Sequence, residues 1–315
     1  MSHSTCLLSR KEHCTLGMFK RPFRLLLIAV ATWGLAAGAI FSFSRQPVYA
    51  DRSLSQWVER LAANGVHSPP QESEQAILGI GTNALPHLLK WIARKPTPPW
   101  RVKLNETVNR FTKRTLLIDK RSLRSQGALF AFSILGSEAR PAIPALRCLV
   151  NNSKTDYSTS WRATSCLSHL GPEALPALLD ALTNHFPGVR RYAADNFPSF
   201  GTNSRPAVPL LLLCLKDCSE DVAGAAAMTL GRLHLDASVV VPELTKSLQD
   251  LRPAVQRGAA IGLGLFGSEA QSALPALRQL EYRWGYAVAH ALDQIDTNRP
   301  TTSTRYWTPK RQGMR

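Results

Sequence analysis

A proline recurs at nearly constant intervals through the second half of this 315-residue chain. Successive prolines are 32, 33, 33 and 33 residues apart, and leucine follows each one two positions later. The prolines are Pro144, Pro176, Pro209, Pro242 and Pro275. Such a period is typical of a solenoid, in which each unit buries its apolar face against its neighbours. The repeat therefore strongly constrains the fold of the protein, but it says little about the function.

One unit, residues 174–201, predicts a pair of antiparallel helices. Pro176 suits a first helical turn, where the N–H that proline lacks would have no partner. A second apolar stripe with helical spacing starts at Val189, and Gly201 suits the left-handed conformation that ends a helix. Pro198 should kink or shorten that second helix. We therefore expect an all-α, right-handed solenoid of about six helix pairs.

Two motifs of the repeats resemble those of a known family. Gly-Pro-Glu-Ala-Leu-Pro-Ala-Leu at 171–178 lies between helices, and Val-Arg-Arg-Tyr-Ala-Ala at 189–194 lies in a second helix. They resemble the HEAT-repeat family, in its bacterial phycobilisome-lyase-like variety, over roughly residues 75–295. The resemblance implies HEAT-like helix pairs whose surface binds another protein, of unknown identity.

The resemblance also implies an alternative, an enzyme of lyase or hydroxylase type with a metal or cofactor site in the solenoid groove. A related hydroxylase branch holds iron with His-Glu dipeptides, and this sequence contains none. It also lacks a glycine-rich phosphate loop, a G-x-S-x-G elbow and an H-E-x-x-H motif. Cys148, Cys166 and His169 would form only a partial zinc site without a fourth ligand. We therefore predict a non-catalytic protein without a cofactor or a metal.

The positive charge of the protein, formally +16, is unevenly distributed. Residues 125–282 carry 13 basic and 13 acidic side chains, whereas an insert at residues 90–124 carries 11 and 2. The insert would add a loop or an extra helix to one face of the solenoid. It could contact an anionic surface such as lipid headgroups, or it could be only a solvated face; nucleic acid is not expected. The candidate contacts are Lys103, Arg110, Lys113 and Arg114.

An uncharged segment of 19 residues, Leu25–Phe43, precedes the repeats and is long enough to cross a bilayer as a helix. The tail before it, residues 1–24, is basic, so that the positive-inside rule places the N-terminus in the cytoplasm and the repeats outside. The alternative is a signal peptide cleaved near Ala50, with export of the remainder. The domain prediction assigns residues 51–296 to the solenoid and 297–315 to a disordered tail.

The favoured function is a membrane-tethered scaffold for protein–protein interaction, because stacked helix pairs present an extended surface. Candidate contacts are polar residues outside the apolar stripes of the second helices, where they should be exposed. The alternative for each is a charge that only solvates the helix. The candidates are Arg190, Arg191, Asp195, Gln256 and Arg257.

Overall fold

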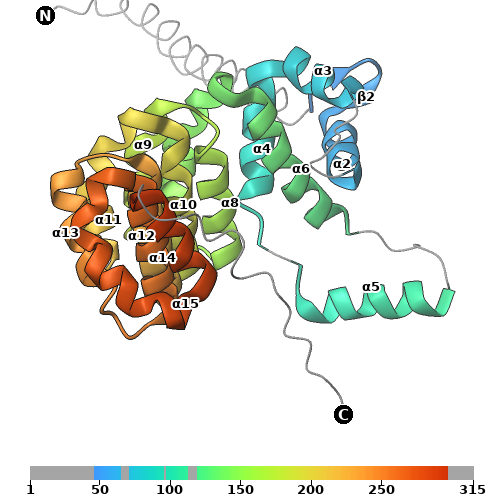
Figure 1. Cartoon of the computed structure of the whole chain (residues 1–315). Coiled ribbons are helices and arrows are strands. Elements are labelled where there is room, and N and C mark those ends of the chain that lie inside the picture. Colours follow the sequence, from blue (N-terminus) through green and yellow to red (C-terminus); the bar gives the residue numbers. More distant parts are fainter. Residues whose placement is uncertain (1–45, 65–70, 96, 113–118, 297–315) are drawn as a thin grey trace, which may run out of the picture. The chain divides into compact units, whose positions relative to one another are not determined.

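The computed structural model describes residues 46–64, 71–95, 97–112 and 119–296. Its contacts divide the protein into a unit of residues 1–47 and a unit of residues 48–315, and the repeats lie in the second unit. That unit is an α-solenoid, as the proline period predicts (Figure 1).

The helices form pairs that are joined by short turns or 3₁₀ segments. Before the first proline of the period come α2 (Leu54–Asn64), α3 (Gln71–Ile80), α4 (Leu85–Ile92), α5 (Pro99–Thr112) and α6 (Lys120–Leu135). The first helices of the following units are α7 (Ile143–Asn151), α9 (Leu175–Ala181), α11 (Val208–Cys214), α13 (Ala237–Ser247) and α15 (Leu274–Ile295). The second helices are α8 (Tyr157–Leu167), α10 (Pro187–Asn196), α12 (Glu220–Leu233) and α14 (Pro253–Phe266).

These two sets form the two layers of the stack. Figure 1 shows α9, α11 and α13 on one side and α10, α12 and α14 on the other. The second helices contact one another in sequence order, α8 with α10, α10 with α12 and α12 with α14. A continuous apolar core, including Phe132, Phe197 and Phe266, lies between the layers.

Proline begins the first helices in most units, but one unit differs. Pro144, Pro176, Pro209 and Pro275 occupy the first turns of α7, α9, α11 and α15, as predicted. Pro242 instead lies inside α13, which starts five residues earlier at Ala237. The reason is the preceding helix end: His234 takes the left-handed conformation at φ 50° where the other units have glycine.

Short 3₁₀ segments that contain or directly follow a glycine connect most units. They are η1 (Gly81–Ala84), η2 (Gly136–Ala142), η3 (Pro172–Ala174), η4 (Phe197–Ala207) and η5 (Gly267–Ala273). Gly201 and Gly267 both have φ 54°, which favours glycine at the end of a helix. Pro198 lies at the start of η4, so that α10 ends at Asn196, and the predicted shortening of this helix is confirmed.

Glycines allow α12 and α14 to pack backbone against backbone. A Cβ atom added to Gly231 would lie 2.4 Å from the Cα atom of Gly262, and one added to Gly258 would lie 2.3 Å from the carbonyl oxygen of Gly224. Real Cβ atoms do not approach other atoms so closely. These four glycines therefore set the spacing between the last two second helices.

A small hairpin precedes the helices and departs from the strictly all-α expectation. β1 (Val48–Tyr49) pairs antiparallel with β2 (Arg52–Ser53). Its turn residues, Ala50 and Asp51, have φ of 44° and 60°, the positive values that a two-residue hairpin turn requires. The candidate cleavage position Ala50 thus lies in this turn.

The predicted localisation, a single-pass membrane protein with an anchor at Leu25–Phe43, is corrected by the structure. Across residues 46–296, apart from the short gaps given above, no helix has the length and apolar character needed to span a bilayer. The single-pass assignment is therefore wrong on this finding. The segment Leu25–Phe43, the basic tail 1–24 and the tail 297–315 lie outside the described residues.

Candidate interaction surface

The side chains on the second helices divide into some that hold the stack together and some that face outward. Arg190 belongs to the first group. Its Nε and Nη2 donate to the two carboxylate oxygens of Asp217, each at 2.7 Å, and its Nη1 donates to the carbonyl oxygen of Asn184 at 2.7 Å. The side chains of Arg190 and Asp217 are only 12% and 10% exposed. The prediction that Arg190 is an exposed contact is corrected: it joins neighbouring repeats.

This ion pair also shifts the proton affinities of its members. The hydrogen bond from Arg190 is the main cause that lowers the pKa of Asp217, against an opposing effect of burial. The same bond raises the pKa of Arg190. Both groups are therefore charged at neutral pH, which suits a two-pronged hydrogen-bonded pair.

Similar side chains reach back to carbonyl groups at the ends of first helices in preceding units. Arg162 donates from Nε to Ile92 and from Nη2 to Arg94, at the end of α4. Arg252 donates from Nη2 to the carbonyl oxygen of Leu215, at the end of α11. The last carbonyls of a helix have no partner within it, so that these bonds satisfy them and connect one unit to another.

Gln256 is the second candidate that the structure corrects. It is 3% exposed, and its Nε2 donates to the carbonyl oxygen of Leu248 at 3.0 Å. This bond links the end of α13 to α14 within one unit. Gln256 therefore stabilises the repeat and is not available to a partner.

The other three candidates lie together. Arg191 and Asp195 on α10 and Arg257 on α14 line one shallow hollow of about 170 Å³, with Asp221 of α12 between them. We call these four residues the charged patch. Two are basic and two are acidic, and the Nε of Arg191 lies 3.8 Å from a carboxylate oxygen of Asp195. Burial raises the pKa of Asp195, against the opposing charges of Arg191 and Arg232.

Aromatic side chains gather on α8 and α10, and α10 also carries Arg191 and Asp195 of the charged patch. Tyr192 belongs to the motif at 189–194, but the sequence did not indicate it as a contact residue. Trp161 of α8 and Tyr192 of α10 meet edge to face, with ring centroids 5.4 Å apart. Tyr157, at the start of α8, is 47% exposed and makes a similar contact with Phe186 at 5.7 Å. The Tyr192 hydroxyl is 3.0 Å from the Ser165 hydroxyl. We call Tyr157, Trp161 and Tyr192 the aromatic row.

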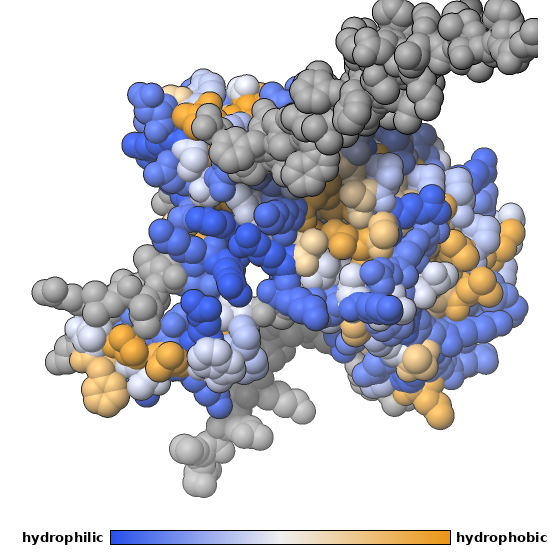
Figure 2. All heavy atoms as spheres, turned by 180° about the vertical axis from the view of Figure 1, so that it is seen from behind, coloured by the Kyte–Doolittle hydropathy of each residue, from blue (hydrophilic) through white to orange (hydrophobic). Residues whose placement is uncertain are grey.

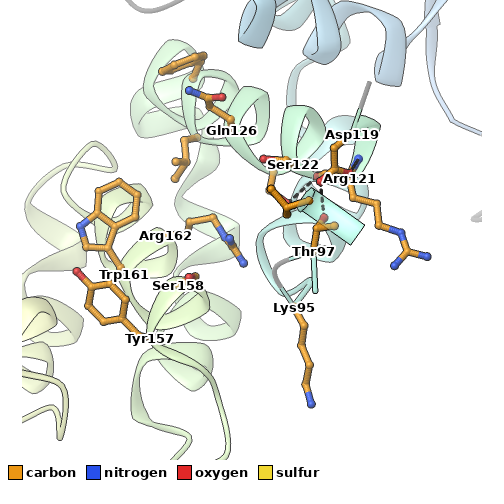
Figure 3. A pocket seen from close by; sticks show the side chains of 14 residues that line it. Lys95, Thr97, Asp119, Arg121, Ser122, Gln126, Tyr157, Ser158, Trp161 and Arg162 are labelled. Carbon is orange, nitrogen blue, oxygen red and sulfur yellow. Dashed lines mark hydrogen bonds between the residues drawn. The ribbon is translucent and has the colours of Figure 1, made fainter. Parts of the chain in front are cut away.

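Two members of the aromatic row, Tyr157 and Trp161, line a cavity of about 610 Å³ between α6 and α8 (Figure 3). Leu129 and Phe130 of α6 face Tyr157 and Trp161 of α8 across it. In Figure 3 the side chain of Arg162 lies between the aromatic pair and the Thr97–Asp119 hydrogen bond. The cavity opens where the polypeptide leaves the repeats to form the insert.

The insert forms the extra helix α5, none of whose residues is buried. Lys103 and Arg110 are exposed on it, whereas Lys113 and Arg114 lie outside the described residues. Trp100 and Phe111 are 66% and 85% exposed, and Figure 2 shows hydrophobic atoms among hydrophilic ones on this projecting segment. The contact of α5 with an anionic surface stays a prediction.

Within the part of the protein that the structure describes, no group of three or more His, Cys, Asp or Glu side chains could hold a metal ion. Cys166 is buried and Cys148 is exposed, and both are free thiols. Burial raises the pKa of the Cys166 thiol well above its ordinary value. That thiol is therefore protonated at neutral pH and behaves as a small apolar core residue.

Comparison with known proteins supports the fold. A family model described as HEAT repeats matches residues 208–293. The karyopherin Kap121p, in its structure bound to the SUMO protease Ulp1p, superposes with a TM-score of 0.50 at 13% identity, over 77% of this chain and 29% of that one. Kap121p bound to the extreme C-terminus of the protein phosphatase Cdc14p gives 0.50 at 12%, with the same coverage.

A designed armadillo repeat protein in complex with the peptide (KR)4 gives a TM-score of 0.41 at 17% identity, over 78% of this chain and all of that one. This chain spans less than a third of the length of Kap121p. No curated protein matches its sequence. The structural likenesses show the fold alone, and the phycobilisome-lyase-like variety stays a prediction from the motif.

Proposed function

We propose that this protein, whose residues 208–293 are HEAT repeats, is a non-catalytic scaffold that binds an extended segment of a partner protein. The segment would lie across the second helices, from α8 to α14. The observation that supports the proposal is that α10 contributes to both features, Tyr192 to the aromatic row and Arg191 and Asp195 to the charged patch.

The dimensions of the stack suit such a segment. Packed helices lie about 8–10 Å apart, and an extended strand advances about 3.3 Å per residue, so that each helix would be crossed by about three residues. The steps from α8 to α14 would therefore accommodate about eight residues. Rigid aromatic side chains give a large contact area at a low entropic cost, and arginine adds directional hydrogen bonds.

Two structural neighbours are themselves complexes with a protein partner. Both are Kap121p structures, one with the SUMO protease Ulp1p and one with the extreme C-terminus of the protein phosphatase Cdc14p. For this protein we propose only the chemical character of the partner. It would present apolar or aromatic side chains to the aromatic row and charges of both signs to the charged patch.

Selection of peptides from a random displayed library on the full-length protein tests the proposal. The affinity of enriched peptides should fall at least about tenfold when Trp161→Ala and Tyr192→Ala are combined. Replacing a buried aromatic residue at the centre of an interface with alanine typically costs about 2 kcal/mol or more in binding free energy. Arg191→Glu should change which peptides are enriched, because it reverses one charge of the patch. Thermal unfolding of each variant establishes that it is folded.

Val239→Ser is the matched control for this experiment. Val239 is 53% exposed on α13, a first helix, so that removing its apolar surface leaves the second helices untouched. Peptides that bind the control and the aromatic variant equally well would contradict the proposed surface. Failure of the library to yield any peptide for the wild-type protein would do the same.

A further inference from the structure

The cavity between α6 and α8 exists because the insert interrupts the stack. The polypeptide leaves α4 at Ile92 and re-enters the repeats at Asp119, the residue that caps α6. The Thr97 hydroxyl donates to the Asp119 carboxylate and closes this loop at its base. The resulting volume, about 610 Å³, falls within the range of about 300–1,000 Å³ that is usual for ligand sites.

The walls of the cavity are mainly apolar. Leu129 and Phe130 form one side, and Tyr157 and Trp161 form the other. Trp161 is held by its edge contact with Tyr192, so that its ring is already positioned before a ligand arrives. A prepositioned aromatic wall favours an aromatic or branched aliphatic group.

The charge of the cavity is positive. Its lining contains Lys95, Arg121 and Arg162 but a single carboxylate, that of Asp119. This carboxylate already accepts the hydroxyl proton of Thr97 and the backbone N–H of Arg121, the latter at 3.1 Å. In Figure 3, Lys95 and Arg121 extend away from the centre of the cavity, at its rim, whereas Arg162 lies inside.

Arg162 has one nitrogen that the fold leaves available. Its Nε and Nη2 are bound to backbone carbonyls of the α4 end, but Nη1 has no hydrogen-bond partner among the described residues. Nη2 also donates to the Thr159 hydroxyl at 3.2 Å, so that three hydrogen bonds fix the guanidinium and Nη1 remains as a donor. The first turn of α6, which includes Ser122, also lies at the cavity and adds the positive end of a helix dipole.

We propose that this cavity binds an apolar group that carries a carboxylate. In a partner protein, this would be an aromatic or aliphatic side chain next to an acidic residue, or such a side chain on the C-terminal residue. The apolar part would lie against Trp161 and Tyr157, and the carboxylate would accept from Arg162. The assignment of the source to a protein rests on the proposed function, since Tyr157 and Trp161 belong to both the cavity and the proposed peptide surface.

Three small probes test the pocket on the full-length protein by isothermal titration. N-acetylphenylalanine carries a terminal carboxylate, N-acetyl-phenylalanyl-glutamate amide carries a carboxylate on its glutamate, and N-acetylphenylalaninamide carries none. At least one acidic probe should bind about tenfold or more tightly than the neutral one, as expected for a hydrogen bond to a charged group. The tighter of the two acidic probes identifies the source. Equal binding of all three, or none at millimolar concentration, would overturn the proposal.

Ser122→Glu provides a variant that should fold and yet lose this selectivity. An acidic residue in the first turn of α6 is favourable for the helix, while it places a competing negative charge at the cavity. The preference for the acidic probes should disappear. Ser133→Glu makes the same change on α6 at an exposed position outside the lining and should leave the preference intact.

The two proposals can fail separately. If displayed peptides depend on the charged patch but the probes ignore the cavity, the scaffold function stands and the pocket assignment falls. If the probes bind with the predicted preference and Trp161→Ala removes their binding, while no displayed peptide is enriched, the pocket stands without the extended peptide surface.

Discussion

The two ends of the stack of second helices are packed in different ways. At the C-terminal end, α12 and α14 meet through Gly224, Gly231, Gly258 and Gly262, and their backbones touch. At the N-terminal end, the helices α6 and α8 face each other with large side chains and enclose a cavity of about 610 Å³. The second helices thus pack backbone against backbone at the C-terminal end, which we call the closed end. At the N-terminal end, the open end, α6 and α8 leave a cavity between them.

The difference follows from the sequence of each region. The C-terminal units keep the 33-residue period and place small residues where helices cross, so that nothing separates the backbones. The N-terminal units contain the insert, which separates α4 from α6, and their facing residues include Phe130 and Trp161. A regular period with small residues therefore favours close backbone packing, and an interrupted period leaves room for a cavity.

The largest effect on stability should come from closing the space between α12 and α14. In Gly231→Ala the new methyl group would lie 2.4 Å from the Cα atom of Gly262, so that a helix backbone must move. We expect a loss of about 3 kcal/mol in the free energy of unfolding, after the gain of about 1 kcal/mol in helix propensity is included. Denaturant unfolding followed by circular dichroism measures it.

Gly188→Ala on α10 is the control for this comparison. Its Cβ atom would lie 2.8 Å from the far end of the Tyr157 side chain, which can turn aside. We expect a change within about 0.5 kcal/mol. An equal loss in both variants would show that the backbone contact of α12 and α14 is not special.

A smaller loss should follow from breaking the pair between Arg190 and Asp217. Arg190→Ala leaves the largely buried carboxylate of Asp217 without its main partner, and also removes the bond to the Asn184 carbonyl. We expect destabilisation by about 2 kcal/mol, since the pair is partly hydrated. Arg147→Ala removes a pair whose side chains are 49% and 31% exposed, and it should cost less than about 0.5 kcal/mol.

The same pair predicts how stability depends on pH. The pKa of Asp217 is lower in the folded protein than its ordinary value of 3.8, so that the unfolded protein binds this proton more readily in acid. The contribution of the pair is therefore complete above about pH 5 and is lost as the pH falls through the folded-state pKa. The difference in unfolding free energy between wild type and Asp217→Asn should shrink below pH 4. A difference that stays constant to pH 2 would contradict this linkage.

Most of the fold could be predicted from the sequence because it is local and periodic. The prolines and the stripe beginning at Val189 report helix starts and buried faces directly. The start of α13 could not be predicted, since His234 takes a left-handed conformation that glycine usually supplies. The two ring nitrogens of His234 lie within hydrogen-bond distance of the Leu265 carbonyl and the Glu269 carboxylate. Both partners belong to the end of the following unit, at α14 and η5.

The site was predicted less completely, for a physical reason. A second helix in a solenoid is covered by its own first helix and by neighbours on both sides, so that its exposed arc is narrower than that of an ordinary surface helix. One of two residues adjacent in sequence can therefore be buried while the other is exposed. Arg190 is largely buried and Gln256 is buried, whereas Arg191 and Arg257 are exposed. The cavity depends on contacts between distant residues, such as Arg162 with Arg94, which no short motif reports.

The smallest effect on stability is expected from the insert, the feature that opens the N-terminal end. Lys103 and Arg110 are exposed on α5, a helix that has no buried residue. Replacing both with Gln should change the free energy of unfolding by less than about 0.5 kcal/mol, because exposed charges contribute little to folding. A loss of more than 1 kcal/mol, roughly, in denaturant unfolding would mean that α5 packs on the repeats through these residues. The insert would then help to hold the N-terminal end together, and the contrast between an open and a closed end would be weakened.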